Sequence, residues 1–292
     1  MKGLIITNPY DFGLNQRHKT RRMASELDNL GVFVDVVSND KFLAYIENGT
    51  VKSSVNADFA LYFDKDKYIA QMLEKRGIRV FNSAQATALC DDKMLTHIAL
   101  SDAGIPMPTT LSGTLCYNKE GKVSRQYLQQ VVQTLNFPLV VKECYGSYGE
   151  QVYLVKDMDE LRNTVERIKF KPYLFQQFVG QSAGRDMRVI VIGSKVICGM
   201  IRQSKTDFRS NAELGGTSQA VDVPQDIAQL CERVAKIIGL DYCGIDVLLG
   251  DRPQICEVNS NAMFSAMEQA TNINVARKYS EHIVRTIKNL TE

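Results

Sequence analysis

Short apolar runs alternate with amphipathic segments along residues 1–90. Four of the runs predict buried strands, at residues 3–7, 32–37, 57–63 and 78–81. Helical patterns lie between them, at about residues 17–30 and 68–76, and each ends beside a glycine suited to a helix C-terminus. This β-α-β order predicts an α/β fold that starts with a parallel, doubly wound sheet.

A polar loop, residues 8–20, follows the first predicted strand. It contains no Gly-x-Gly-x-x-Gly, so a dinucleotide fingerprint is absent. The loop and the helix after it carry four cationic side chains, Arg17, Lys19, Arg21 and Arg22. Sheets of this kind bind ligands beyond the carboxyl ends of their strands, which makes anion binding one interpretation. We favour the simpler one, a solvated helix face.

The pattern changes after residue 81. Residues 83–103 predict one long helix, capped by Ser83 and ended by Gly104, before Pro106 and Pro108 begin a linker. Further strands are predicted at residues 139–143, 151–155, 173–179, 185–193, 195–202, 242–249 and 255–259. Helices are predicted at residues 157–168, 224–238 and 275–290. We divide the chain into predicted domains 1–88, 89–180 and 181–292.

Composition excludes several classes of protein. Of 292 residues, 45% are apolar and 23% charged, and the net charge of +2 gives no reason to expect nucleic acid or membrane partners. No signal peptide and no apolar run of membrane-spanning length is present. Seven scattered cysteines without a Cys-x-x-Cys pair favour a reducing cytoplasm, and three histidines make a histidine-rich zinc site improbable.

Acidic and amide side chains interrupt the last two predicted strands. Glu257 and Asn259 lie two residues apart and therefore on one face of their strand. A hairpin through residues 250–253 can bring Asp246 beside Glu257. Three hard oxygen donors on one face suit Mg²⁺ or Mn²⁺. We prefer this metal site to the alternative, a hairpin with ordinary surface acids.

A glycine-rich turn follows Lys142. Gly146, Ser147 and Gly149 can present backbone N–H groups to phosphate oxygens, with Lys142 adding a positive charge. An ordinary turn between two strands explains the same residues equally well.

A second group of charges lies on the strands at residues 185–202. Asp186 and Arg188 share one face, and Arg202 lies on the partner strand. A structural ion pair between Asp186 and Arg188 is the alternative to a functional role. The loop at 207–216 contains Arg209 and Asn211 and is more polar than a connector needs.

Seven motifs in one order resemble the ATP-grasp superfamily, in particular its branch of RimK-like carboxylate–amine ligases. They are Asp92-Lys93, Leu139-Val140-Val141-Lys142 with Gly146-Ser147-x-Gly149, Gln176-Gln177-Phe178-Val179, Gly184-Arg185-Asp186-Met187-Arg188, Asp207-Phe208-Arg209-Ser210-Asn211 with Gly215-Gly216, Gly244-Ile245-Asp246, and Glu257-Val258-Asn259. The resemblance covers the chain from about Leu89 onward. It implies a pre-ATP-grasp domain followed by a two-subdomain ATP-grasp fold.

The resemblance also implies roles. The nucleotide would be held by Lys93, Lys142, Gly146, Ser147, Gly149, Gln176, Gln177, Phe178, Val179, Asp186 and Arg188. Lys93 and Lys142 would meet the phosphates, the 146–149 turn would close as a lid, and Asp186 would accept from the ribose. The γ-phosphate and acceptor region would be lined by Arg202, Arg209 and Asn211, and Mg²⁺ would be held by Asp246, Glu257 and Asn259.

Two positions depart from the family pattern. Gln177 stands where the adenine-binding hinge usually has Glu, and a backbone contact survives that exchange. Gln151 stands where the phosphate turn usually has a further glycine, so the lid is expected to be stiffer.

The implied reaction joins a small carboxylate to an amine through an acyl phosphate, at the expense of ATP. Glutamate or another amino acid or peptide is the implied partner, and a homodimer is possible by analogy. Two alternatives stay open: an ATP-binding regulatory module without turnover, and a kinase-like enzyme that phosphorylates a stable acceptor.

Overall fold

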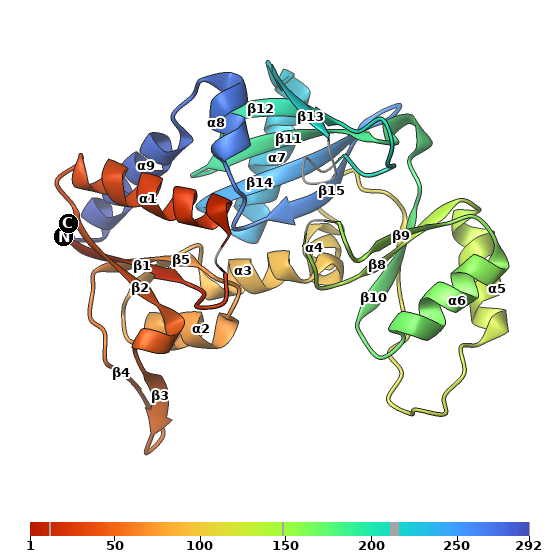
Figure 1. Ribbon diagram of the computed structural model, residues 1–292, viewed down its shortest axis with the longest axis horizontal. Coiled ribbons are helices and arrows are strands. Elements are labelled where there is room, and N and C mark those ends of the chain that lie inside the picture. The colour runs from red at the N-terminus through yellow and green to blue at the C-terminus, as the bar shows by residue number, and fades with distance from the viewer. Residues whose placement is uncertain (12, 148, 211–215, 292) are drawn as a thin grey trace.

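The chain begins with a four-stranded parallel sheet. A computed structural model describes residues 1–292 except 12, 148, 211–215 and 292, and Figure 1 shows the elements in order. The sheet has the order β2-β1-β5-β6, formed by β1 (Lys2–Thr7), β2 (Phe33–Ser38), β5 (Phe59–Phe63) and β6 (Arg79–Phe81). All of its pairings are parallel, as predicted.

Helices cover both faces of this sheet. The side chains of β1 alternate, so Ile5 packs with α1 (Leu14–Asp28) on one face while Leu4 and Ile6 pack with α2 (Lys67–Lys75) on the other. The doubly wound fold is therefore confirmed. A hairpin of β3 (Ala44–Glu47) and β4 (Thr50–Ser53), which was not predicted, extends away from the sheet (Figure 1).

The middle of the chain forms a four-stranded antiparallel sheet with the order β7-β10-β8-β9. Its strands are β7 (Thr110–Ser112), β8 (Leu139–Glu143), β9 (Val152–Val155) and β10 (Tyr173–Gln177). Helices α5 (Arg125–Leu135) and α6 (Met158–Ile168) supply the apolar side chains that cover one face. Asp157 caps α6 as predicted, accepting from the backbone of Asp159 and Glu160.

A five-stranded antiparallel sheet, ordered β13-β12-β11-β14-β15, forms the last part. Its strands are β11 (Arg185–Ile192), β12 (Lys195–Gln203), β13 (Thr217–Val221), β14 (Tyr242–Leu249) and β15 (Pro253–Asn259). Helix α7 (Gln225–Ile238) covers one face. On the opposite face, α8 (Ser265–Thr271) and α9 (Val275–Thr291) cover only the apolar end, which leaves the polar end open to a cleft.

The segment predicted as one helix at residues 83–103 is two helices, α3 (Ala84–Asp91) and α4 (Lys93–Leu100). Asp92 has an extended backbone, and its side chain accepts from the backbone N–H groups of Met94 and Leu95 at 2.9 and 3.1 Å. An aspartate whose carboxylate accepts from the backbone N–H groups two and three residues later starts a new helix instead of continuing the old one. The prediction of a single helix was wrong, while the cap at Ser83 is confirmed.

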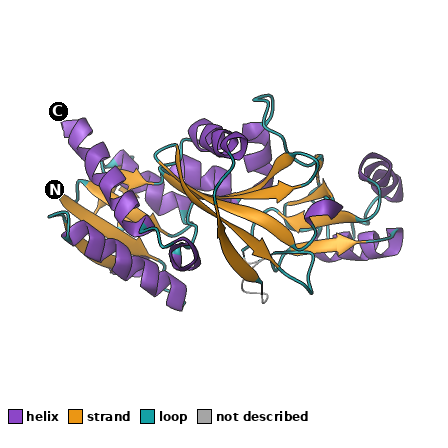
Figure 2. Cartoon of the chain, turned by 90° about the horizontal axis from the view of Figure 1, so that it is seen from above, coloured by secondary structure: helices purple, strands orange, loops and turns teal. Residues whose placement is uncertain are grey.

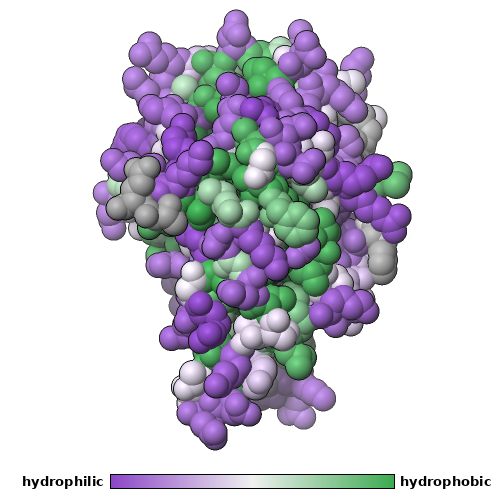
Figure 3. Space-filling view, turned by 90° about the vertical axis from the view of Figure 1, so that its left-hand side faces the viewer, coloured by the Kyte–Doolittle hydropathy of each residue, from purple (hydrophilic) through white to green (hydrophobic). Residues whose placement is uncertain are grey.

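The termini lie together at one end of the molecule because α9 returns to pack against α1 (Figures 1 and 2). The parallel sheet ends at residue 81 and the four-stranded antiparallel sheet begins at residue 110; that sheet ends at residue 177 and the five-stranded sheet begins at residue 185. The domain boundaries predicted after residues 88 and 180 lie in these two gaps and stay predictions. On the face toward this end, hydrophilic side chains surround smaller apolar areas (Figure 3). No helix in the described part of the chain is long and apolar enough to cross a membrane.

Lys19 is fully buried where the first and last parts of the chain meet. Its side chain has no exposed surface, and its Nζ lies 4.4 Å from the ring centroid of Phe63 and 5.2 Å from that of Tyr242. Burial lowers the pKa of Lys19 to about 7. The predicted solvated helix face is therefore wrong for Lys19, although Arg17 and Arg21 are exposed on the same helix. Three of the residues that contact Lys19, Tyr242, Asn261 and Ala262, come from the last part of the chain.

Replacing Lys19 with methionine should make the protein more stable near pH 6. Between about pH 7 and 10.5 the unfolded chain keeps a proton on Lys19 that the folded chain has lost, so the stability of the wild type rises with pH. The advantage of the variant should shrink by up to roughly 1.4 kcal/mol per pH unit across that window. Urea unfolding of both proteins at several pH values measures this. A difference that does not change with pH would contradict it.

Candidate active site

A cleft of about 580 Å³ opens where the three larger sheets meet. Its lining includes the carboxyl ends of β1 and β5, the turn after β8, the segment after β10, and the polar end of the five-stranded sheet. The size suits a ligand of nucleotide dimensions. Of the predicted site residues, all that the structure describes line this cleft; Asn211 lies outside the described residues.

The floor of the cleft is built by β14 and β15. These strands pair antiparallel with Asp246 opposite Glu257, and Asn259 follows two residues later on the same face. The predicted hairpin thus brings the three residues together. Asp246 is buried, whereas the Glu257 side chain is 32% exposed and lies 3.7 Å from the Lys93 ammonium.

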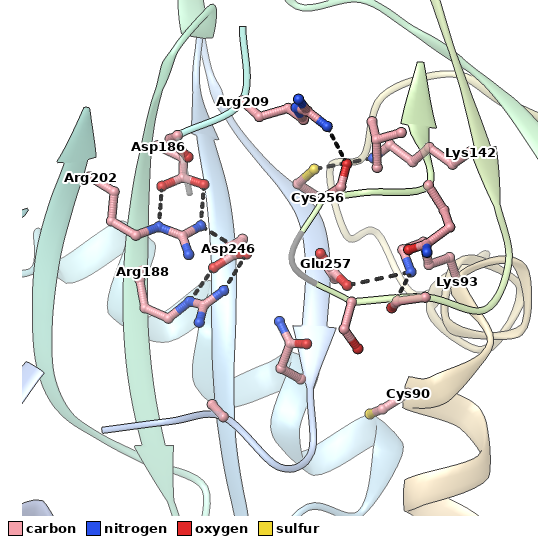
Figure 4. Close-up of a pocket in the computed structure, with 18 of the residues that line it drawn as sticks. Cys90, Lys93, Lys142, Asp186, Arg188, Arg202, Arg209, Asp246, Cys256 and Glu257 are labelled. Atoms are coloured by element: carbon pink, nitrogen blue, oxygen red, sulfur yellow. Dashed lines mark hydrogen bonds and ion pairs between the residues drawn. The ribbon is translucent and has the colours of Figure 1, made fainter. Parts of the chain in front are cut away.

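Four charged side chains form a continuous ion-pair chain beside this floor (Figure 4). Arg188 meets both carboxylate oxygens of Asp246 at 2.5 and 2.6 Å. Arg202 meets both oxygens of Asp186 at 2.8 and 2.5 Å and also reaches Asp246 at 2.9 Å. The ion pair considered from sequence, Asp186 with Arg188, is therefore not the one that forms.

The ion-pair chain links three strands because the sheet register aligns its members. Asp186 faces Arg202 across β11 and β12, and Arg188 faces Asp246 across β11 and β14. Burial acts to raise the pKa of Asp246, but the charges of Arg188 and Arg202 outweigh it and hold that pKa below its usual value. Burial acts to lower the pKa of Arg202, and the two aspartates raise it overall. Asp246 and Arg202 are therefore charged near neutral pH.

The donors on the floor suit a hard cation better than a soft one. The described residues contain no group of three His, Cys, Asp or Glu side chains placed to hold a metal. The predicted set instead combines two carboxylates with the amide of Asn259, all oxygen donors of the kind that Mg²⁺ takes. Both oxygens of Asp246 already accept from arginines, so Glu257 and Asn259 are the freer donors.

Two lysines face the floor from the opposite wall. Lys93 is the first residue of α4, directly after the Asp92 break; its backbone N–H donates to Cys144 at 3.0 Å and its Nζ to the carbonyl of Gly146 at 3.1 Å. The Lys142 ammonium lies 3.5 Å from the sulfur of Cys256 on β15. Both lysines come from outside the five-stranded sheet, so they face its acidic floor across the cleft.

The glycine-rich turn lies over the cleft and is held from three sides. Ser147 accepts from Lys65 at 3.2 Å, Gly146 from Lys93, and Gly149 from Arg209. Gly146 has a φ of +148°, and a Cβ there would lie 2.3 Å from the side-chain oxygen of Gln151. Gln151, which departs from the family pattern, therefore fills the space beside this glycine.

The segment at 176–179 divides into a structural and a cleft-lining part. The buried side chain of Gln176 bonds Thr110 at 2.9 Å and the ring of His97 at 3.2 Å, and burial lowers the pKa of His97 to about 4. The backbone N–H of Gln177 donates to Thr109 at 2.9 Å. Phe178 contacts Phe208 edge to face across the cleft, with ring centroids 6.3 Å apart.

Sequence reasoning missed one wall of the cleft. Cleft-lining residues that it did not select include Asn8, Asp11, Phe63, Asp64, Lys65, Cys90, Asp91, Asn261 and Ala262. Several of them follow β1 or β5, and the carboxyl ends of parallel strands are the usual ligand edge of such a sheet. The rule was applied to the loop at residues 8–20, where the solvated interpretation was preferred, but not to the residues after β5. The contact of Asp91 with Lys65 at 2.7 Å could not be read from sequence.

Comparison with known proteins now identifies the family. Residues 90–283 match the model of the RimK-like ATP-grasp domain. The chain belongs to the RimK-like ATP-grasp family. The resemblance seen in the motif order is thus confirmed. Beta-citrylglutamate synthase B from Homo sapiens is 34% identical to this RimK-like chain over 278 residues, 88% of this chain and 69% of that protein.

A second relative and a solved structure agree with this placement. N-acetylaspartylglutamate synthase A from Homo sapiens is 36% identical over 231 residues, which are 77% of this chain but only 57% of that protein. D-alanine–D-alanine ligase from Bacillus anthracis, solved in complex with ATP, shares 18% identity with a TM-score of 0.75 over 99% of this chain and 98% of its own. The latter likeness establishes the ATP-grasp fold, which was predicted.

Replacing Arg202 with methionine should destabilise the protein by about 3–5 kcal/mol, because Asp186 and Asp246 would stay buried with fewer opposite charges. The matched control is Arg162→Met, whose ion pair with Asp159 has side chains 61% and 83% exposed. That variant should lose less than about 1 kcal/mol. Chemical denaturation measures both, and equal small losses would contradict the argument.

Proposed function

We propose that this protein is an ATP-dependent carboxylate–amine ligase that forms an amide bond through an acyl phosphate. The observation that carries the proposal is the opposition of two lysines, Lys93 and Lys142, to the oxygen donors of Glu257 and Asn259 across one cleft. The triphosphate of ATP needs positive charges on one side of the cleft. The divalent metal that accompanies it needs oxygen donors on the other side. Membership of the RimK-like family supports the same reaction.

The donor set fits Mg²⁺ or Mn²⁺ bound with ATP. Glu257 and Asn259 would hold the ion, with Asp246 as a third donor whose place is fixed by Arg188. A bound ion would neutralise phosphate charge during transfer. Lys93 and Lys142 would neutralise the remaining phosphate oxygens, and the segment at 177–179 would receive the adenine.

Carboxylate activation explains why a ligase needs this arrangement. A carboxylate does not condense with an amine in water because its oxygen leaves poorly. Transfer of the γ-phosphoryl group to that oxygen gives an acyl phosphate and ADP. Attack by the neutral amine then forms the C–N bond, phosphate leaves, and the nitrogen loses a proton. We assign the stabilisation of the transferring group to Arg209, which contacts the lid turn.

The lid turn would protect the acyl phosphate from water. Lys65, Lys93 and Arg209 each contact it from a different part of the chain, so closure brings several parts of the fold together. For the amine we propose glutamate, because both relatives compared above are named for products that contain it. Citrate and N-acetylaspartate, the acyl groups in those names, are the first carboxylates to try.

Hydroxylamine trapping tests the reaction class. With ATP, Mg²⁺ and a carboxylate substrate, we expect a hydroxamate to form, because hydroxylamine captures an acyl phosphate. Release of ADP with a stable phosphorylated acceptor and no hydroxamate would favour the kinase-like alternative. ATP binding without ADP release across a broad panel of carboxylates and amines would favour a regulatory module and overturn the ligase proposal.

Replacing Glu257 with glutamine should lower turnover at least a hundredfold, because an amide cannot replace a charged metal donor. Its melting temperature should stay within a few degrees of the wild type, since Glu257 is partly exposed and its contact with Lys93 is long. The matched control is Glu281→Gln on the outer face of α9, which should keep full activity. Phosphate release with thermal unfolding separates loss of chemistry from loss of fold. Full activity in the Glu257 variant would be incompatible with the metal assignment.

A further inference from the structure

Lys19 makes its contacts with the loop that follows the metal-donor strand. Its ammonium donates to the side-chain oxygen of Asn261 and, at 3.2 Å, to the backbone carbonyl of Ala262. That carbonyl also accepts from the hydroxyl of Tyr242 at 2.8 Å. Within the described part of the chain, Lys19 forms no ion pair with a carboxylate. A buried cation without a counter-ion costs stability, so its presence calls for a function.

The contact with Lys19 fixes which way the Asn261 amide points. In its protonated form the Lys19 ammonium only donates, so the edge of the amide that faces it is the oxygen. The nitrogen edge is then left for the other side, and Asn261 lines the cleft. No partner for this nitrogen is found among the described residues. Asn261 therefore presents a hydrogen-bond donor to the cleft, and its contact with Lys19 sets the orientation of that donor.

The surroundings favour an anionic ligand at this donor. Lys19 donates to Asn261 and, in its protonated form, adds positive potential at this point of the cleft. Among the acidic groups that line the same cleft, Asp91 pairs with Lys65 at 2.7 Å, Asp64 accepts from the amides of Asn8 at 3.1 Å and of Asn39, and Asp11 accepts from the backbone of Gly13. An acceptor atom with negative charge, such as a carboxylate oxygen, satisfies both the free donor and the cation below it.

We propose that Asn261 binds a carboxylate of the amino-acid substrate and that Lys19 is the positioning residue that holds the Asn261 amide in its donating orientation. This inference rests on the proposed ligase function for the identity of the substrate, L-glutamate. Asn261 would be a specificity-determining contact at the edge of the cleft nearest the parallel sheet. Lys19, which has no exposed surface, would act only through it.

Equilibrium binding of L-glutamate, in the presence of ADP and Mg²⁺, tests this pairing without requiring turnover. Lys19→Met and Asn261→Ala should each weaken glutamate binding at least tenfold, while the affinity for ATP stays within twofold. The double variant should bind no more weakly than Asn261→Ala alone, because Lys19 acts through Asn261. Arg21→Met, which removes an exposed charge from the same helix, is the control and should bind like the wild type.

The variant Asn261→Asp distinguishes a contact with the substrate from a purely structural role in holding the loop. Aspartate has the same shape and would pair with Lys19, so a purely structural role predicts an intact or stabilised protein with normal binding. The proposed contact predicts the opposite for binding, because the donor is lost and a negative charge faces the substrate. The affinity for glutamate should then fall at least as far as in Asn261→Ala. The melting temperature should be kept or raised.

Three outcomes would overturn the inference. They are an absence of glutamate binding by the wild type, single variants that bind glutamate with an affinity within twofold of the wild type, and a loss of affinity in the double variant that equals the product of the two single losses. These failures are distinct from failure of the ligase proposal. The latter is decided by hydroxamate formation and does not depend on which residue holds glutamate.

Discussion

The ion-pair chain of Asp186, Arg202, Asp246 and Arg188 is the constraint on which the site depends. It crosses three strands of one sheet at a point where that sheet's face changes from apolar to polar. Toward α8 and α9 the same face carries Ile190 and Met200, which are part of the core. Because buried charges tolerate little displacement from their partners, the pairing stabilises the observed register of β11, β12 and β14. The turn between β14 and β15 then brings Glu257 opposite Asp246, which completes the floor of the cleft.

The opposite wall depends on a different local device. Asp92 ends one helix and caps the next, which places Lys93 at the first position of α4 beside the turn after β8. If the helix had continued, that lysine would lie within a regular helix with its backbone N–H bonded inside it. The break instead frees the backbone of Lys93 to bond Cys144 while its ammonium reaches both Gly146 and Glu257. The Lys93 side chain therefore contacts both the lid turn and the floor of the cleft.

Local sequence patterns were sufficient to predict which residues lie together where those residues are close in sequence. Strand alternation and a short turn predicted Glu257 beside Asp246, and the hairpin at Gly193 predicted Arg202 on the strand that pairs with the strand of Asp186. The pairing of Arg188 with Asp246 needs β11 to lie beside β14, a long-range choice that no local pattern contains. The break at Asp92 was missed because helical residues continue on both sides of it. Asn261 was overlooked because its environment is created by a helix near the other end of the chain.

Lys19 and the ion-pair chain show two ways of keeping charge inside this protein. In the ion-pair chain every carboxylate meets a guanidinium, so the cost of burial is offset within the fold. Lys19 has aromatic rings, an amide and a carbonyl around it, which orient its ammonium without neutralising it. A paired group holds a structure in place, whereas an unpaired one leaves electrostatic potential for a ligand to use. The first kind lies between strands of one sheet, and the second lies beneath the edge of the cleft.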